Sequence, residues 1–116
     1  MSTRVVVTAR CADQVKTFGR QYNDFSATFE QLCATLEKSP TAGIPLGKKV
    51  YKQRLPMAGK GKSGGFRVIY HYDPERHYHA DSDGGTLTLL LFFRKSDQDT
   101  IEPKEIAELL KRASLG

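Results

Sequence analysis

Residues 15–36, with the sequence VKTFGRQYNDFSATFEQLCATL, carry the strongest periodic pattern in the chain. Hydrophobic and aromatic side chains recur there at alternating spacings of three and four, which places them on one stripe of a helix. They are Val15, Phe18, Tyr22, Phe25, Phe29, Leu32 and Leu36. Gly19 and Asn23-Asp24 interrupt the pattern, so it fits either one bent helix or two helices joined near residues 19–24. About three heptads in a small mixed domain favour a core-facing stripe over a coiled coil.

Strand patterns lie on both sides of this helical region. Residues 4–9 form a short β-branched segment, and residues 40–47 are rich in Pro and Gly, so we interpret them as a loop. Three further segments with strand character follow, at residues 50–55, 66–72 and 87–93. The last is apolar on both faces, as expected of an inner strand. A closing helix should begin at Pro103 and bury Ile106, Leu109, Leu110 and Ala113.

The predicted order is therefore strand, helical region, three strands, helix. Short links between the later strands imply an antiparallel sheet of about four strands, with the helices packed on one face. The fold class is α+β. A length of 116 residues fits a single domain spanning residues 1–116.

Composition excludes several classes of protein. Hydrophobic residues make up 39% and charged residues 27%, which is typical of a folded chain. No apolar run approaches the roughly 18 residues of a membrane span, and the first residues resemble a strand more than a signal peptide. We therefore expect a cytoplasmic protein with no membrane partner. Cys11 and Cys33 are too few for a disulfide scaffold and lack the spacing of a zinc site.

Charge is concentrated in one part of the sequence. The formal net charge is +5, yet residues 39–72 contain no Asp or Glu and carry seven basic residues. These are Lys48, Lys49, Lys52, Arg54, Lys60, Lys62 and Arg67. Clustered Lys and Arg bind polyanions because they neutralise phosphates and release counterions, so nucleic acid is the leading partner class. An ordinary solvated face, or a surface matched to an acidic protein, is the alternative.

Other short motifs do not support a metal or cofactor. Gly61-Lys62-Ser63 resembles the end of a phosphate loop, but Pro56 stands where the first glycine is required and a strand follows instead of a helix. Asp81-Ser82-Asp83-Gly84 fits a turn better than a calcium loop. His77 and His79 lack an obvious third ligand, and a lone strand histidine such as His71 is more often structural than catalytic. We predict no metal and no cofactor.

One set of cations could perform chemistry together. Strand alternation places Lys52 and Arg54 on one face, and an antiparallel sheet can bring Arg67 and the pair Arg94-Lys95 to the same surface. RNA cleavage by 2′-hydroxyl attack needs a base, a stabiliser of phosphorane charge and an acid, and cations can fill all three roles. Lysine can give up a proton and arginine cannot, so Lys52 is the expected base. Arg54 holds phosphate and favours the neutral amine of Lys52, Arg67 clamps phosphate, and Lys95 donates the proton.

Three stretches resemble toxins of the RelE/ParE superfamily, in particular its RelE/HigB branch. They are residues 47–55 (GKKVYKQRL), residues 61–70 (GKSGGFRVIY) and the closing strand of residues 89–96, and the likeness extends over about residues 4–112. The resemblance implies the toxin of a bacterial type II toxin–antitoxin module, which cleaves mRNA in the ribosomal A site and is silenced by an antitoxin.

Carried over by position, the resemblance assigns catalysis to Lys52, Arg54, Arg67 and Lys95. Arg94 is the less favoured alternative to Lys95. We expect RNA contacts from Lys48, Lys49, Lys60, Lys62 and Arg94. Ile101 stands where RelE-type enzymes often have a tyrosine that stacks on a base. Two alternatives therefore accompany the endoribonuclease: a ParE-like inhibitor of DNA gyrase, and an inactive module that binds nucleic acid or antitoxin.

Overall fold

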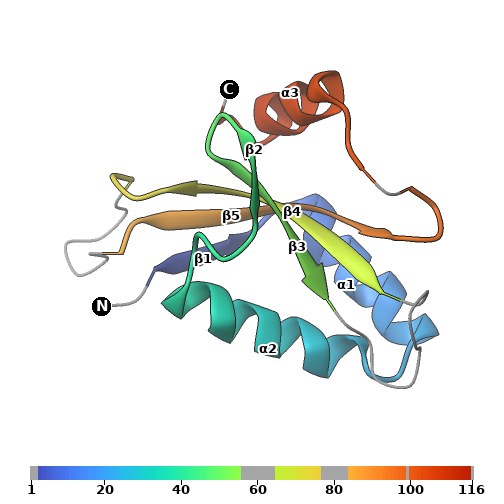
Figure 1. The fold of residues 1–116 in the computed structure, drawn as a ribbon. Coiled ribbons are helices and arrows are strands. Elements are labelled where there is room, and N and C mark those ends of the chain that lie inside the picture. Colours follow the sequence, from blue (N-terminus) through green and yellow to red (C-terminus); the bar gives the residue numbers. More distant parts are fainter. Residues whose placement is uncertain (1–2, 56–64, 77–83, 99, 116) are drawn as a thin grey trace.

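The computed structural model describes residues 3–55, 65–76, 84–98 and 100–115. Within these residues, eight elements follow one another (Figure 1). They are β1 (Arg4–Val7), α1 (Ala9–Gln21), α2 (Phe25–Lys38), β2 (Ile44–Gly47), β3 (Val50–Leu55), β4 (Phe66–Asp73), β5 (Thr86–Arg94) and α3 (Pro103–Arg112). The α+β class predicted from the sequence is confirmed.

The helical region consists of two helices and not one bent helix. Thr8 caps the first of them, since its hydroxyl accepts a hydrogen bond from the Cys11 N–H at 3.3 Å. The chain leaves α1 at Tyr22 and enters α2 at Phe25, so the break falls within the interruption seen in the sequence. All seven residues of the periodic stripe pack into one core, which confirms the core-facing interpretation.

The sheet has five strands, in the order β1-β5-β4-β3-β2. The fifth is β2, in the segment that we interpreted as a loop. The Pro and Gly content of residues 40–47 favours a loop, but β2 is an edge strand, and an edge strand tolerates Pro45 because its missing N–H need not be part of the ladder. The sheet is also mixed, because β1 runs parallel to β5 while the other pairs are antiparallel. The expectation of a purely antiparallel sheet was wrong in this respect.

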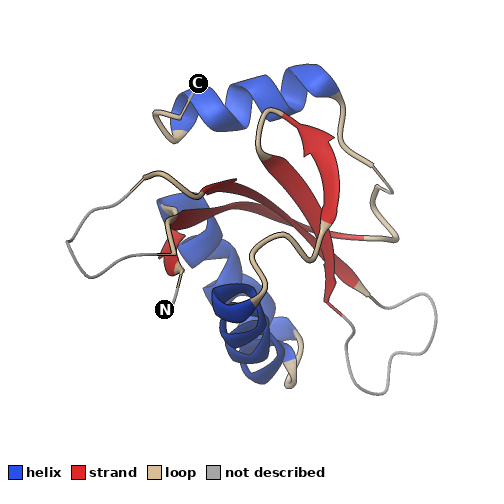
Figure 2. Ribbon diagram, turned by 60° about the vertical axis from the view of Figure 1, so that its left-hand side comes forward, coloured by secondary structure: helices blue, strands red, loops and turns tan. Residues whose placement is uncertain are grey.

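The helices cover both faces of the sheet, whereas the sequence analysis placed them on one (Figures 1 and 2). One core packs β-strand residues such as Val68 and Phe92 against α1 and α2. The other packs Ile69 and Leu90 against α3. A strand that is apolar on both sides, as β5 is, needs cover on both sides, and this is the physical reason for the difference. We call the two surfaces the α1/α2 face and the α3 face.

Side chains form hydrogen bonds with backbone groups near the end of β5 and at the start of α3. Beyond the end of β1, the Gln14 amide donates to the Phe92 carbonyl at 2.8 Å and accepts from the Phe92 N–H at 2.9 Å, in the manner of a paired strand. At α3, Glu102 and Glu105 form a reciprocal capping box ahead of the buried helix face. Within the described residues, no helix is long and apolar enough to cross a membrane.

Candidate functional site

The register of β3 and β4 places three of the predicted cations on the α3 face. Arg54 lies directly opposite Arg67, and Lys52 lies opposite Ile69, which belongs to the core under α3. Alternation along each strand therefore brings Lys52, Arg54 and Arg67 to one surface. Arg54 is exposed, and the other two are half-buried.

Gly65 shows how closely the two arginines approach each other. A Cβ built at Gly65 would lie 3.2 Å from Nη1 of Arg67 and 4.0 Å from Nε of Arg54. Both guanidinium groups therefore lie over the bare backbone of this glycine. The Arg67 Nη1 group also donates to the Phe66 carbonyl at 3.3 Å, which holds its planar group near the start of β4. Within the described residues, no ion pair neutralises Arg54 or Arg67.

Lys95 joins this group from the end of β5. Its backbone N–H donates to the Gly65 carbonyl at 3.1 Å, so the pairing of β4 with β5 continues one residue past Arg94. Because Arg67 pairs with Phe93, and Phe93 packs under α3, the next pair in phase also faces α3. Lys95 is exposed on that surface. We call Lys52, Arg54, Arg67 and Lys95 the basic set.

Arg94 does not join the basic set. It pairs with Phe66 and lies on the α1/α2 face, where it binds the Asp97 carboxylate with Nε at 2.8 Å and Nη2 at 2.9 Å. Its Nη1 group donates to the Tyr22 hydroxyl at 3.0 Å. Hydrogen bonds to Asp97 and Tyr22 raise the pKa of Arg94, and the same contact with Arg94 lowers the pKa of Asp97. The expected convergence of Arg94 with the other cations is therefore not found.

Lys48 and Lys49 form the tight turn between β2 and β3. Both have positive φ, at 55° and 65°, in a two-residue turn where Asn and Gly are the usual residues. Lys49 Nζ lies 3.4 Å from Asp73 Oδ1, while Lys48 is exposed beside the C-terminal part of α3. Lys60, Lys62, His77, His79 and Asp81 lie outside the described residues.

His71 is buried on the α3 face, opposite Val50 and Thr88. Its Nδ1 atom makes no hydrogen bond within the described part of the chain. Burial lowers the pKa of the imidazole, and the neighbouring Lys49 acts in the same direction while Asp73 opposes it. No group of three or more His, Cys, Asp or Glu residues that could hold a metal ion occurs among the residues that the structure covers.

Ile101 lies in the core and not at the surface. It is 6% exposed and packs with Val50, Ile69 and Phe93 beneath α3. Phe93, also 6% exposed, is the sole aromatic residue of that core. Among the described residues, the α3 face therefore offers no exposed ring on which a base could stack.

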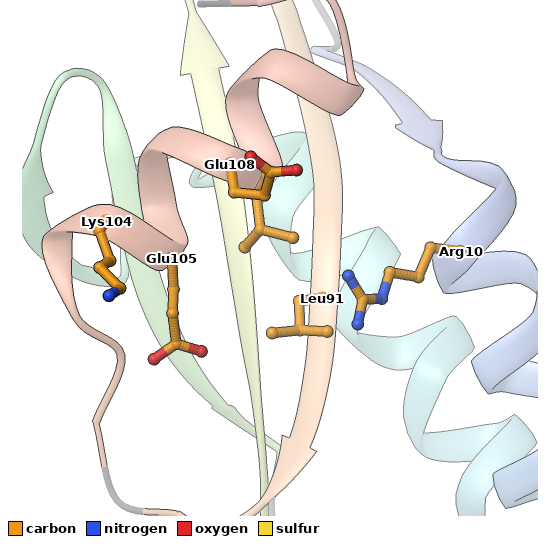
Figure 3. Close-up of a pocket in the computed structure, with 6 residues that line it drawn as sticks. Arg10, Leu91, Lys104, Glu105 and Glu108 are labelled. Atoms are coloured by element: carbon orange, nitrogen blue, oxygen red, sulfur yellow. The ribbon is translucent and has the colours of Figure 1, made fainter.

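A hollow of about 480 Å³ opens between α3 and the start of α1 (Figure 3). Arg10 reaches from α1 toward Leu91, and Glu105 and Glu108 extend from α3. Its lining carries both signs of charge and includes no member of the basic set. The basic set draws its side chains from β3, β4 and the residue after β5, and Arg54 also lines a second hollow, of about 200 Å³, with residues of α2.

Comparison with known families identifies the family of the chain. The family model of the RelE toxin of the RelE / RelB toxin–antitoxin system matches residues 14–115. The chain belongs to the RelE toxin family. This confirms the resemblance drawn from the sequence, and it makes the protein the toxin of a toxin–antitoxin system with an antitoxin as its partner. No curated protein matches the chain.

Three residues of the candidate site, Gly65, Tyr22 and Asp97, have roles that are not evident from the sequence pattern. Gly65 was quoted within a motif but given no role, and only the structure shows two guanidinium groups lying over it. Tyr22 was assigned to the helix stripe, where it does pack, but its hydroxyl also binds Arg94. Asp97 follows Arg94 by three residues, a spacing that could have suggested the ion pair.

Proposed function

We propose that this RelE-family toxin is a metal-independent endoribonuclease that cleaves mRNA, on the ribosome, in the cytoplasm. The observation that carries the proposal is the approach of Arg54 and Arg67 over Gly65, next to Lys52 and Lys95. Both guanidinium groups lie near Gly65, and neither forms an ion pair within the described residues, so both can donate to the oxygens of one phosphodiester.

The four side chains divide the reaction among them. Lys52 takes the proton of a 2′-hydroxyl, whose oxygen then attacks the adjacent phosphorus. Arg67 and Arg54 hold the non-bridging oxygens and stabilise the extra negative charge of the phosphorane-like transition state. Lys95 gives a proton to the departing 5′-oxygen. The products are a 2′,3′-cyclic phosphate and a 5′-hydroxyl end.

The position of Ile101 supports a role for the ribosome in this reaction. RNA modules that act alone usually hold unpaired bases by stacking them on aromatic rings. The described part of the α3 face has no exposed ring, because Phe93 is buried and the position of the expected tyrosine is occupied by Ile101, which is also buried. We infer that the ribosome holds the mRNA while the basic set supplies charge and proton transfer. The predicted contacts from Lys48, Lys60 and Lys62 would add affinity for phosphates, whereas Lys49 and Arg94 are already paired with Asp73 and Asp97.

The chemistry can be tested with ribosomes programmed with a short mRNA. The expected result is cleavage of the all-ribose mRNA and none when the nucleotide 5′ to the cut carries a 2′-deoxy sugar. Lys52→Arg should reduce the rate strongly, because charge is kept but a feasible base is lost. Lys104→Ala, which removes an exposed lysine of α3, is the matched control. Cleavage of the 2′-deoxy substrate, or full activity of Lys52→Arg, would contradict the mechanism.

The buried Ile101 also favours a second candidate, an inactive module that binds nucleic acid or antitoxin. Such a module would bind mRNA or ribosomes and leave both the normal and the 2′-deoxy substrate intact. The ParE-like alternative would instead inhibit purified DNA gyrase, and that inhibition would be insensitive to Arg67→Ala.

A further inference from the structure

We propose that Arg94, Asp97 and Tyr22 are positioning residues that hold Lys95 at the basic set from the opposite face of the sheet. We call these three residues the Arg94 anchor. The inference rests on the proposed function, because it gives Lys95 a task in cleavage, and it assigns the neighbouring arginine a different task from RNA binding.

The contacts of the anchor involve all three nitrogens of one guanidinium group and use three of its five N–H donors. Nε and Nη2 of Arg94 bind the two oxygens of Asp97 at 2.8 and 2.9 Å, and Nη1 binds the Tyr22 hydroxyl at 3.0 Å. This fork geometry fixes the orientation of the side chain, unlike a single contact to a lysine. The backbone adds to it, because the Arg94 carbonyl accepts from the N–H groups of Asp97 at 3.0 Å and Gln98 at 3.2 Å.

Tyr22 connects the anchor to the hydrophobic core next to Gly65. Tyr22 ends α1 and packs edge-on against Phe66, with ring centroids 5.3 Å apart. Phe66 is buried, pairs with Arg94 and directly follows Gly65. The guanidinium of Arg94 is therefore held by a helix end that packs against the strand carrying Gly65 and Arg67.

Fixing Arg94 fixes the direction of Lys95. Arg94 is the last residue of β5, and Lys95 begins the turn that follows it. The bond between Lys95 and Gly65 is in phase with the Arg67–Phe93 pair, so with Arg94 held on the α1/α2 face the next side chain lies toward α3. Lys95 lies one residue beyond β5, and its backbone has one hydrogen bond there, to the Gly65 carbonyl at 3.1 Å. Without the anchor, this last pair would open easily, as strand ends do.

The anchor contributes little to overall stability, which separates positioning from folding. Arg94 and Asp97 side chains are 41% and 53% exposed, and ion pairs this exposed to solvent contribute little to stability. A substitution that breaks the pair should leave the fold intact while changing the geometry at Lys95. Small displacements at a reacting centre are costly, and about tenfold or more in rate is common.

The test uses Asp97→Asn, which keeps the shape and removes the charge, in the native chain and in a Lys95→Ala background. Ribosome-bound mRNA cleavage gives kcat and KM, and amide hydrogen exchange reports on the Lys95 N–H. We expect kcat about tenfold lower with KM unchanged, faster exchange at Lys95, an unchanged Tm, and no further loss of kcat when Lys95 is already alanine. Glu108→Gln, which breaks the exposed 3.1 Å pair with Arg112 on α3, is the matched control and should change none of these.

The outcomes separate the two proposals. If the native protein cleaves but Asp97→Asn changes neither kcat nor Lys95 exchange, the anchor is refuted and the proposed function stands. If Asp97→Asn lowers kcat equally in the Lys95→Ala background, Arg94 does not act through Lys95 and the inference is also refuted. If the native protein does not cleave, the proposed function fails, and the role for Lys95 in cleavage fails with it. Lys95 exchange then tests only the contact geometry.

Discussion

Gly65→Ala should separate cleavage from stability more cleanly than removing any charge. The new Cβ would lie 3.2 Å from Arg67 Nη1, 3.7 Å from the Leu55 carbonyl oxygen and 4.0 Å from Arg54 Nε. Only the first distance is tighter than ordinary contact, and its partner is the end of a flexible side chain. Arg67 therefore moves by a few tenths of an ångström while the backbone stays in place. Gly65 is not among the glycines with positive φ, so alanine fits its backbone conformation.

The two expected magnitudes differ widely. Alanine restricts the unfolded chain and raises the free energy of unfolding by about 0.4–1 kcal/mol, which the crowding at Arg67 partly offsets. The net change should stay within about 1 kcal/mol in urea unfolding. A hydrogen bond to a charged group contributes about 1.5–3 kcal/mol, so a displaced guanidinium should lower the cleavage rate about ten- to a hundredfold.

Gly19→Ala is the control for this substitution. Its Cβ would lie 3.2 Å from the Ser26 Oγ, so it creates the same crowding between α1 and α2, away from the basic set. We expect native cleavage rates from this variant. Native rates from Gly65→Ala as well would refute the account of how Arg54 and Arg67 are arranged. A loss of activity that follows loss of folded protein would refute it equally.

Three further predictions concern the fold. Gln14→Ala leaves the Phe92 N–H and carbonyl unpaired, and should lower the free energy of unfolding by about 1–3 kcal/mol in urea titrations; a change under about 0.3 kcal/mol would mean that water replaces the amide. Lys48→Asn with Lys49→Gly should raise it by about 1 kcal/mol, because both positions have positive φ, and should weaken binding to ribosomes; a less stable double variant would contradict the turn assignment. Burial lowers the pKa of His71 below its usual 6.5, so the unfolded chain binds the proton more readily and stability should fall as pH drops below about 6.5. His71→Leu should remove that part of the pH dependence, and an unchanged profile would show that His71 does not cause it.

The fold could be predicted from sequence where hydrophobic residues recur at one regular spacing and so mark a single face of an element. The stripe from Val15 to Leu36 gave the helical region and its core-facing residues, and all seven pack as expected. It could not distinguish one helix from two, because the interruption at residues 19–24 weakens a helix without specifying the turn. The short edge strand β2 was missed because Pro45 is compatible with both an edge strand and a loop.

The same limit explains the site. Lys52 and Arg54 lie two residues apart on a strand with polar and apolar faces, so their shared face could be predicted. Arg94 and Lys95 come at the end of a strand that is apolar on both faces. Its sequence therefore does not show which of the two side chains points to which face of the sheet. The register of β4 with β5 also shifts between Ile69 and Tyr70, where Leu90 is the extra residue in β5. The leucines around this bulge give no sequence signal for it. The bulge nevertheless determines that Lys95, and not Arg94, lies on the same face as Arg67.

The central claim is that the basic set cuts mRNA. The most direct measurement is a map of mRNA 5′ ends in bacteria after brief expression of the native toxin, compared with Arg67→Ala. We predict new ends carrying 5′-hydroxyl groups within translated reading frames, absent from the variant. Growth arrest by the native toxin without new ends, or identical ends from Arg67→Ala, would contradict the claim.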